Sequence, residues 1–149
     1  MKTSTTDLTT RPPRSARVRL GGYVILPRML DKGRATLAGK NAEYRFDCPM
    51  DKRFLSFVGI DANKLKDELA AGKGDGEILD WINANATNKF DSWQIQAWSG
   101  HQENRAPSDT DARAFFQELQ TAAGPKREDV TTWFDLLDLD DYVSFGGKA

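Results

Sequence analysis

The strongest constraint on the fold is a helical pattern with its own start and stop signals in SDTDARAFFQELQTAAGP, residues 108–125. Ser108 and Asp111 are spaced as a capping box at a helix start, and Gly124-Pro125 is typical of a helix end. Between them apolar side chains recur every three or four residues, at Ala112, Phe115, Phe116, Leu119 and Ala123. The pattern predicts an amphipathic helix.

Six further segments carry helix signals of the same kind. Pro27 fits the first turn of a helix that ends before Gly39, and Pro49 fits the first turn of the next one. In residues 43–58 the alternation of Tyr44 and Phe46 also suits a short strand, so the helix from Pro49 is the favoured of two interpretations. The other expected helix starts are Asp61, Asp75, Asp91 with Gln94, and Asp129, and the expected ends lie near residues 69, 82, 100 and 137.

These segments together predict the fold class. About six to seven short helices, joined by Gly, Pro and Asn turns, give an all-α protein built as an irregular compact bundle. The length suits a single domain, expected over residues 1–149. Residues 1–10 are polar and are expected to be frayed. Residues 11–22 are expected to form an extended basic arm, because the prolines at its start have a fixed φ and disfavour the helical conformation in the residues before them.

Charge is distributed unevenly along the chain. Residues 1–40 contain nine Lys or Arg and two acids, whereas residues 107–149 contain four and nine. A basic front end is one way to hold phosphate or nucleic acid. The whole chain, however, has a net charge of −1, and nucleic-acid-binding domains are usually basic overall. Pairing between the arm and the acidic C-terminal segment is therefore the favoured interpretation.

Composition excludes several classes of protein. With 39% hydrophobic and 29% charged residues, the chain is typical of a soluble globular protein. No apolar run approaches the ~20 residues of a membrane helix, and the N-terminus lacks the apolar core of a signal peptide, so a cytoplasmic protein without a membrane partner is expected. One cysteine and one histidine exclude an intramolecular disulfide and a multi-cysteine or multi-histidine metal site. Neither a metal nor a cofactor is expected.

Aspartates crowd the C-terminal segment, where Asp135 and Asp138 are expected on one helix face near the helix end. Carboxylates there oppose the helix dipole and need compensation. Arginine from the arm is the favoured source, because its planar fork matches a carboxylate. A divalent metal and a solvated surface are the alternatives. The candidate binding residues are therefore Arg14, Arg17, Arg19, Tyr23, Arg28, Asp135 and Asp138, together with Trp93, which falls off the apolar stripe of its helix and suits a pocket wall or partner surface.

The single cysteine and the single histidine are weaker candidates. Cys48 stands near Asp47 and Asp51, and neighbouring carboxylates disfavour a nucleophilic thiolate, so Cys48 is interpreted as a small buried apolar residue. His101 is expected just past a helix end, facing solvent or capping the helix. A Cys–His pair remains an open alternative.

Four stretches of the sequence carry a resemblance to a known family. They are RPPRSARVRLGGYVILPRMLDK, CPMD, VGID and TWFDLLDLDDYVSFGGKA. Together they resemble the bacterial family catalogued as domain of unknown function 5069, from about Asp7 to the last residue. The resemblance implies no activity, cofactor or catalytic residue. It does imply that the arm and the C-terminal segment belong to the domain.

Three functional hypotheses follow. The favoured one is a non-catalytic binding or interaction module for a protein or a small anionic ligand, which uses the surface where the basic arm meets the acidic segment. The second is a small enzyme that holds an anionic substrate with Arg17, Arg19 or Arg28 and uses Asp47, Asp135 or Asp138 as general base. The third, nucleic-acid binding through the arm, is the least favoured, and nucleic acid is not an expected partner.

Overall fold

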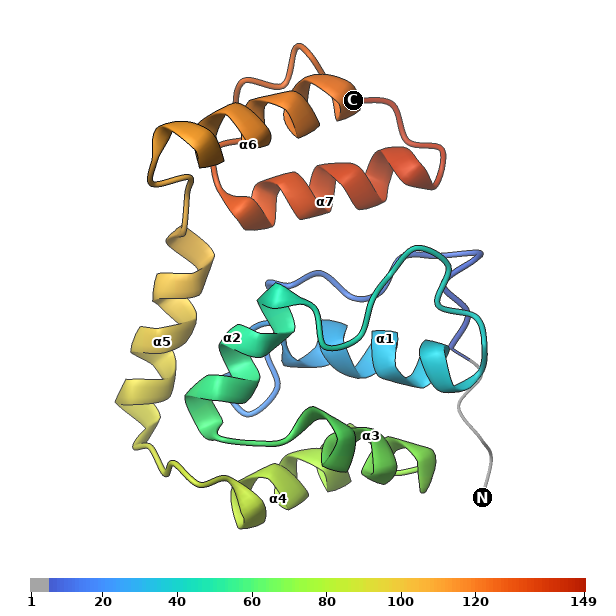
Figure 1. The fold of residues 1–149 in the computed structure, drawn as a ribbon, viewed down its shortest axis with the longest axis vertical. Coiled ribbons are helices and arrows are strands. Elements are labelled where there is room, and N and C mark those ends of the chain that lie inside the picture. The colour runs from blue at the N-terminus through green and yellow to red at the C-terminus, as the bar shows by residue number, and fades with distance from the viewer. Residues whose placement is uncertain (1–5) are drawn as a thin grey trace.

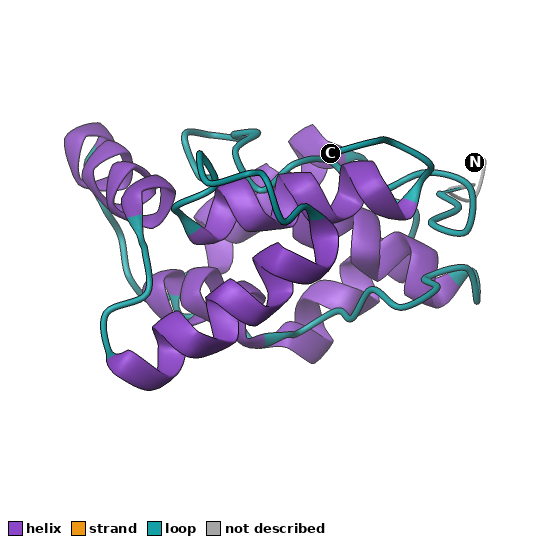
Figure 2. Cartoon of the chain, turned by 90° about the horizontal axis from the view of Figure 1, so that it is seen from above, coloured by secondary structure: helices purple, strands orange, loops and turns teal. Residues whose placement is uncertain are grey.

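The computed structural model describes residues 6–149, and this part of the chain forms seven helices and no strand (Figures 1 and 2). The all-α prediction is confirmed, and so is the helix from Pro49. The helices are α1 (Leu26–Leu37), α2 (Pro49–Val58), α3 (Ala62–Ala70), α4 (Asp75–Asn85), α5 (Ser92–Asn104), α6 (Thr110–Ala123) and α7 (Trp133–Ser144).

The helices form two groups joined by α5. In Figure 1, α6 and α7 lie side by side at one end, α3 and α4 lie at the other, and α1 and α2 lie between them. The larger hydrophobic cluster centres on α1 and α2, and a smaller one lies between α6 and α7. Gly33 allows α1 and α3 to approach closely, because a Cβ at this position would lie 2.6 Å from Leu69 Cδ1.

Two expected helix starts are wrong by one to three residues. Asp109 caps α6 by accepting a hydrogen bond from the Ala112 N–H at 2.7 Å, so the box of Ser108 and Asp111 does not form. Thr132 caps α7, whereas Asp129 pairs with Arg127 at 2.8 Å. In both cases the capping residue lies slightly later in the chain than the one predicted from the spacing.

Helices α5 and α7 also extend further than expected. His101 lies in the last turn of α5 and is exposed, not beyond the helix end. The acidic stretch 138–141 lies inside α7, which places Asp135 in the first turn. There its carboxylate accepts a hydrogen bond from the Thr132 N–H at 3.1 Å, and its negative charge interacts favourably with the positive end of the helix dipole. The expectation that Asp135 opposes the dipole is therefore wrong.

The N-terminal segment is an integral part of the fold. Within the stretch expected to be frayed, residues 1–5 lie outside the described residues, while Leu8 is 1% exposed and its N–H donates to Lys40 O at 2.9 Å. The arm, residues 11–22, contains no helix. Its Ala16 is fully buried and accepts the N–H of Ile25 at 2.9 Å. Ile25 has φ 76°, a strained value for a β-branched residue, and its complete burial holds it there.

The polar face of α1 is buried as well. Arg28 and Lys32 carry the charges of this face, and each residue is only 4% exposed. The loop 38–48 and α7 lie close to this face (Figure 1), so that α1 is enclosed on its polar side too. Buried charges of this kind need partners, and these partners build the site.

Candidate functional site

The predicted pairing between the arm and the acidic segment is present. Arg17 Nε donates to Asp138 Oδ2 at 3.0 Å, and Arg17 Nη2 donates to Asp135 Oδ1. Ser15 Oγ donates to Asp138 Oδ1 at 2.7 Å. Burial works to raise the pKa of Asp135, but hydrogen bonds from Thr131 and Thr132, with the charge of Arg17, outweigh it and lower that pKa.

Two further arginines of the arm, Arg14 and Arg19, pair elsewhere. Arg14 Nη2 lies 3.0 Å from Asp31 Oδ1, and its Nη1 lies 2.7 Å from Asp75 Oδ2. Arg19 Nη2 lies 3.0 Å from Glu103 Oε1. The hydrogen bonds from Arg14 are the main cause of a lowered pKa at Asp75, with Arg34 adding to the effect and burial opposing it. The arm therefore ties α1, α4, α5 and α7 together.

The lowered pKa of Asp75 predicts an acid-dependent loss of stability. A carboxylate whose folded pKa is depressed stabilises the fold above its unfolded value of about 3.9 and loses that contribution as pH falls through the folded value. We therefore expect Asp75→Asn to lower the melting temperature at pH 7 and to flatten its fall below about pH 4. Melting curves of both proteins between pH 2 and 7 measure this, and parallel curves would contradict the assignment.

Tyr23 and Trp93 lie apart from these pairs. Tyr23 is buried in the main core, where its ring meets Phe54 edge-on at 5.1 Å between centroids, and burial raises its pKa. Trp93 is 67% exposed on α5. Its predicted role at a partner surface stays a prediction.

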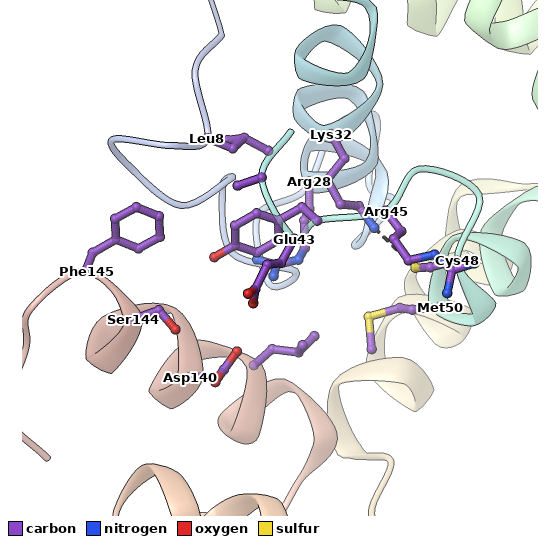
Figure 3. A pocket seen from close by; sticks show the side chains of 13 residues that line it. Leu8, Arg28, Lys32, Glu43, Arg45, Cys48, Met50, Asp140, Ser144 and Phe145 are labelled. Atoms are coloured by element: carbon purple, nitrogen blue, oxygen red, sulfur yellow. Dashed lines mark hydrogen bonds between the residues drawn. The ribbon is translucent and has the colours of Figure 1, made fainter. Parts of the chain in front are cut away.

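A large cavity lies between α1, the loop 38–48 and α7 (Figure 3). Its volume is about 650 Å³, within the range of ligand pockets, and most of its wall is apolar. The lining residues are Leu8, Arg28, Lys32, Ala42, Glu43, Tyr44, Arg45, Cys48, Met50, Leu137, Asp140, Ser144 and Phe145.

A buried ion pair forms the floor of this cavity. Arg28 Nη1 lies 2.7 Å from Asp141 Oδ2, and its Nη2 lies 3.3 Å from Asp141 Oδ1. The hydroxyl of Tyr44 donates to the same carboxylate at 2.8 Å, and the guanidinium lies 5.5 Å from the Tyr44 ring centroid. Burial, with the bond to Asp141, raises the pKa of Tyr44. This network fixes α7 and the loop against α1.

A second buried ion pair lies beside the first. Lys32 Nζ donates to Asp51 Oδ1 at 2.9 Å and to Cys48 Sγ at 3.2 Å. Asp51 Oδ2 also accepts the N–H of Asp47 at 2.9 Å. Cys48, interpreted from the sequence as a buried apolar residue, is thus only half-buried and contacts an ammonium group. No hydrogen bond joins Cys48 to His101 within residues 6–149.

Three charged residues of the cavity wall have no ion-pair or hydrogen-bond partner among the described residues: Glu43, Arg45 and Asp140. Figure 3 places Glu43 nearer Asp140, and Arg45 nearer Cys48 and Met50. Although Asp140 is exposed as a residue, partial burial of its carboxyl raises its pKa, and the charges of Asp141 and Glu43 add to the effect against Arg28.

The predicted site residues do not form one site. Only Arg28 lines the large cavity, whereas Arg17, Asp135 and Asp138 line a separate hollow of about 390 Å³. Sequence reasoning missed Lys32, Tyr44 and Asp141. The sequence contained one signal of this site. Arg28 and Lys32 are four residues apart and share a helix face, so their positive charges point in the same direction.

Two further observations concern function classes. Among residues 6–149, no group of three or more His, Cys, Asp or Glu side chains is arranged to hold a metal ion. No helix there has both the length and the apolarity to cross a bilayer.

Comparison with known proteins places the chain in a family. A family model described as a domain of unknown function (DUF5069) matches residues 10–143. The chain belongs to this family, as the resemblance predicted. No curated protein matches the sequence. The matched range includes the arm, α1, the loop 38–48 and nearly all of α7, and the last three of these segments enclose the cavity.

Proposed function

We propose that this member of the DUF5069 family is a binding module for a small molecule, and that the cavity between α1, the loop 38–48 and α7 is its site. The cavity itself carries the proposal. It has the volume of a ligand pocket, a mostly apolar wall and charged groups at defined places. The two buried ion pairs beneath it are arranged before any ligand arrives, and such preorganisation favours binding.

The cavity suits this role better than the surface of the arm. Arg14, Arg17 and Arg19 each hold a carboxylate already, so a ligand there has to displace an existing partner. The same pairing supports the expectation that nucleic acid is not a partner, because neutralised arginines release few counterions from a phosphate backbone.

We assign no reaction to the site. A general base at neutral pH needs a raised pKa, whereas that of Asp135 is lowered. The two carboxylate oxygens of Asp138 accept hydrogen bonds from Ser15 and Arg17. Asp135 and Asp138 line the separate hollow and fit a structural role, and the proposal therefore remains a binding function.

Filling the cavity tests the proposal. Ser144 lines the cavity, is exposed, and makes no side-chain hydrogen bond among the described residues, so Ser144→Trp fills space without breaking a contact. Thr121→Trp, on the exposed side of α6, is the matched control. Melting temperatures are measured for wild type and both variants against a panel of small organic anions, cations and zwitterions.

We expect one class in the panel to stabilise wild type and Thr121→Trp but not Ser144→Trp. A ligand at one hundred times its Kd adds about 2.7 kcal/mol to the free energy of unfolding, which is roughly 5–10 °C for a chain of this size. The proposal fails if no class raises the melting temperature, or if Ser144→Trp responds as strongly as wild type.

A further inference from the structure

We infer that the ligand of this cavity is a zwitterion, whose ammonium group lies between Glu43 and Asp140 and whose carboxylate pairs with Arg45. This inference rests on the proposed function and names the class of molecule bound. Three observations lead to it: which charges of the wall are already neutralised, which are not, and where the latter lie.

The buried charges of the cavity are already neutralised. The side chains of Arg28 and Asp141 are 5% and 9% exposed, and those of Lys32 and Asp51 are 5% and 1% exposed. Breaking either pair leaves a buried charge without a partner, which is strongly unfavourable. Arg28 and Lys32 therefore shape the cavity, and they are poor candidates for the primary anchor of a ligand charge.

The unpaired charges of the wall have both signs. Arg45 is one cation without an ion-pair partner in residues 6–149, and Glu43 and Asp140 are two such anions, all three on the wall of one cavity. Glu43 and Asp140 come from the loop and from α7, on facing sides in Figure 3. They lie near enough for the charge of Glu43 to contribute to the raised pKa of Asp140.

The two carboxylates suit a ligand that carries an ammonium group. This group has three donors and one positive charge, so it can bind both carboxylates and relieve their mutual repulsion. The guanidinium of Arg45 provides the planar fork that recognises a carboxylate through two parallel hydrogen bonds. Apolar residues, among them Leu137 and Met50, line the cavity with these groups and favour an aliphatic chain between the two charges.

Ligands with a single kind of charge fit less well. A simple anion, including the small anionic ligand expected from the sequence, would meet Arg45 but also the two carboxylates. A simple cation would satisfy the carboxylates and leave Arg45 unpaired. A zwitterion is the simplest kind of ligand that offers an opposite charge to all three side chains.

A series of ω-amino acids tests the inference. Glycine, 4-aminobutyrate and 6-aminohexanoate carry the same two charges at increasing separation, and n-alkylamines and alkyl carboxylates of equal length carry one charge each. Calorimetric titration of the full chain gives a Kd for every compound. We expect one chain length to bind at least tenfold more tightly than its amine and its carboxylate.

Variants of the exposed anchors assign each end of the ligand. Arg45→Gln is expected to reduce zwitterion affinity to that of the matched amine, and Asp140→Asn to weaken binding of the zwitterion and the amine but not of the carboxylate. Arg113→Gln and Asp111→Asn, both exposed on α6, are matched controls expected to leave the Kd unchanged.

The outcomes separate the inference from the proposed function. If single-charge compounds bind as tightly as the zwitterions, and Ser144→Trp abolishes that binding, the inference is overturned and the proposed function stands. An unchanged Kd in Arg45→Gln or Asp140→Asn also overturns it. So does the lack of binding by every ω-amino acid, whereas the proposed function is judged separately by the wider panel.

Discussion

Arg28→Met is expected to lower the free energy of unfolding by about 3–5 kcal/mol, because it leaves the Asp141 carboxylate buried and without its cation. For a chain of this length that corresponds to a fall of roughly 6–20 °C in melting temperature. Tyr44 alone still donates to Asp141 and compensates only part of the loss. Urea denaturation at pH 7 measures the change.

The double variant Arg28→Met/Asp141→Leu separates a buried charge from lost packing. Replacing both partners of a buried pair with apolar side chains is often close to neutral, so we expect the double variant to be more stable than Arg28→Met. Arg19→Met is the surface control. Its partner Glu103 is partly exposed, and such pairs contribute less than about 1 kcal/mol. Equal losses in Arg28→Met and Arg19→Met would contradict this account of the cavity floor.

Asp51→Asn is expected to destabilise the chain by a similar amount, about 3 kcal/mol or more. The amide keeps the shape of the side chain, but Lys32 then lies buried without a negative charge. Asp51 is also the acidic residue in the first turn of α2, where a negative charge interacts favourably with the helix dipole. Thermal unfolding of the variant at pH 7 measures the combined effect.

Asp47→Asn is the matched control for this second pair. Asp47 lies four residues earlier, and its carboxylate is 3.6 Å from Lys52 at the surface. Its φ is 61°, a conformation that asparagine tolerates well. We expect a change below about 1 kcal/mol. A loss as large as that of Asp51→Asn would show that the loop, and not the buried charge, determines the stability.

Local sequence signals predicted the helices well and their ends less well. Asp61 caps α3 as expected, by accepting the Lys64 N–H at 3.0 Å, because its partner lies only three residues away. The starts of α6 and α7 were missed because several Ser, Thr and Asp side chains stand close together there, and any of them can cap.

The candidate site was predictable only in part. Charge counts predicted that the arm pairs with the acidic segment, and Arg17 does so. They did not predict the cavity, because Arg28 and Lys32 on a polar helix face are assigned to solvent unless another element covers them. The partner of Arg28, Asp141, lies 113 residues away in the sequence, and no local pattern reveals a contact of that range.

The most direct test of the central claim is a two-dimensional ¹⁵N–¹H NMR titration of the full chain with the ω-amino acid that binds most tightly. Binding in the cavity is expected to shift amide signals of residues 42–50 and 137–145, which supply most of its wall, and to leave those of α6 unchanged. Shifts centred on the arm, residues 14–19, or on Trp93, with none in the cavity, would contradict the account.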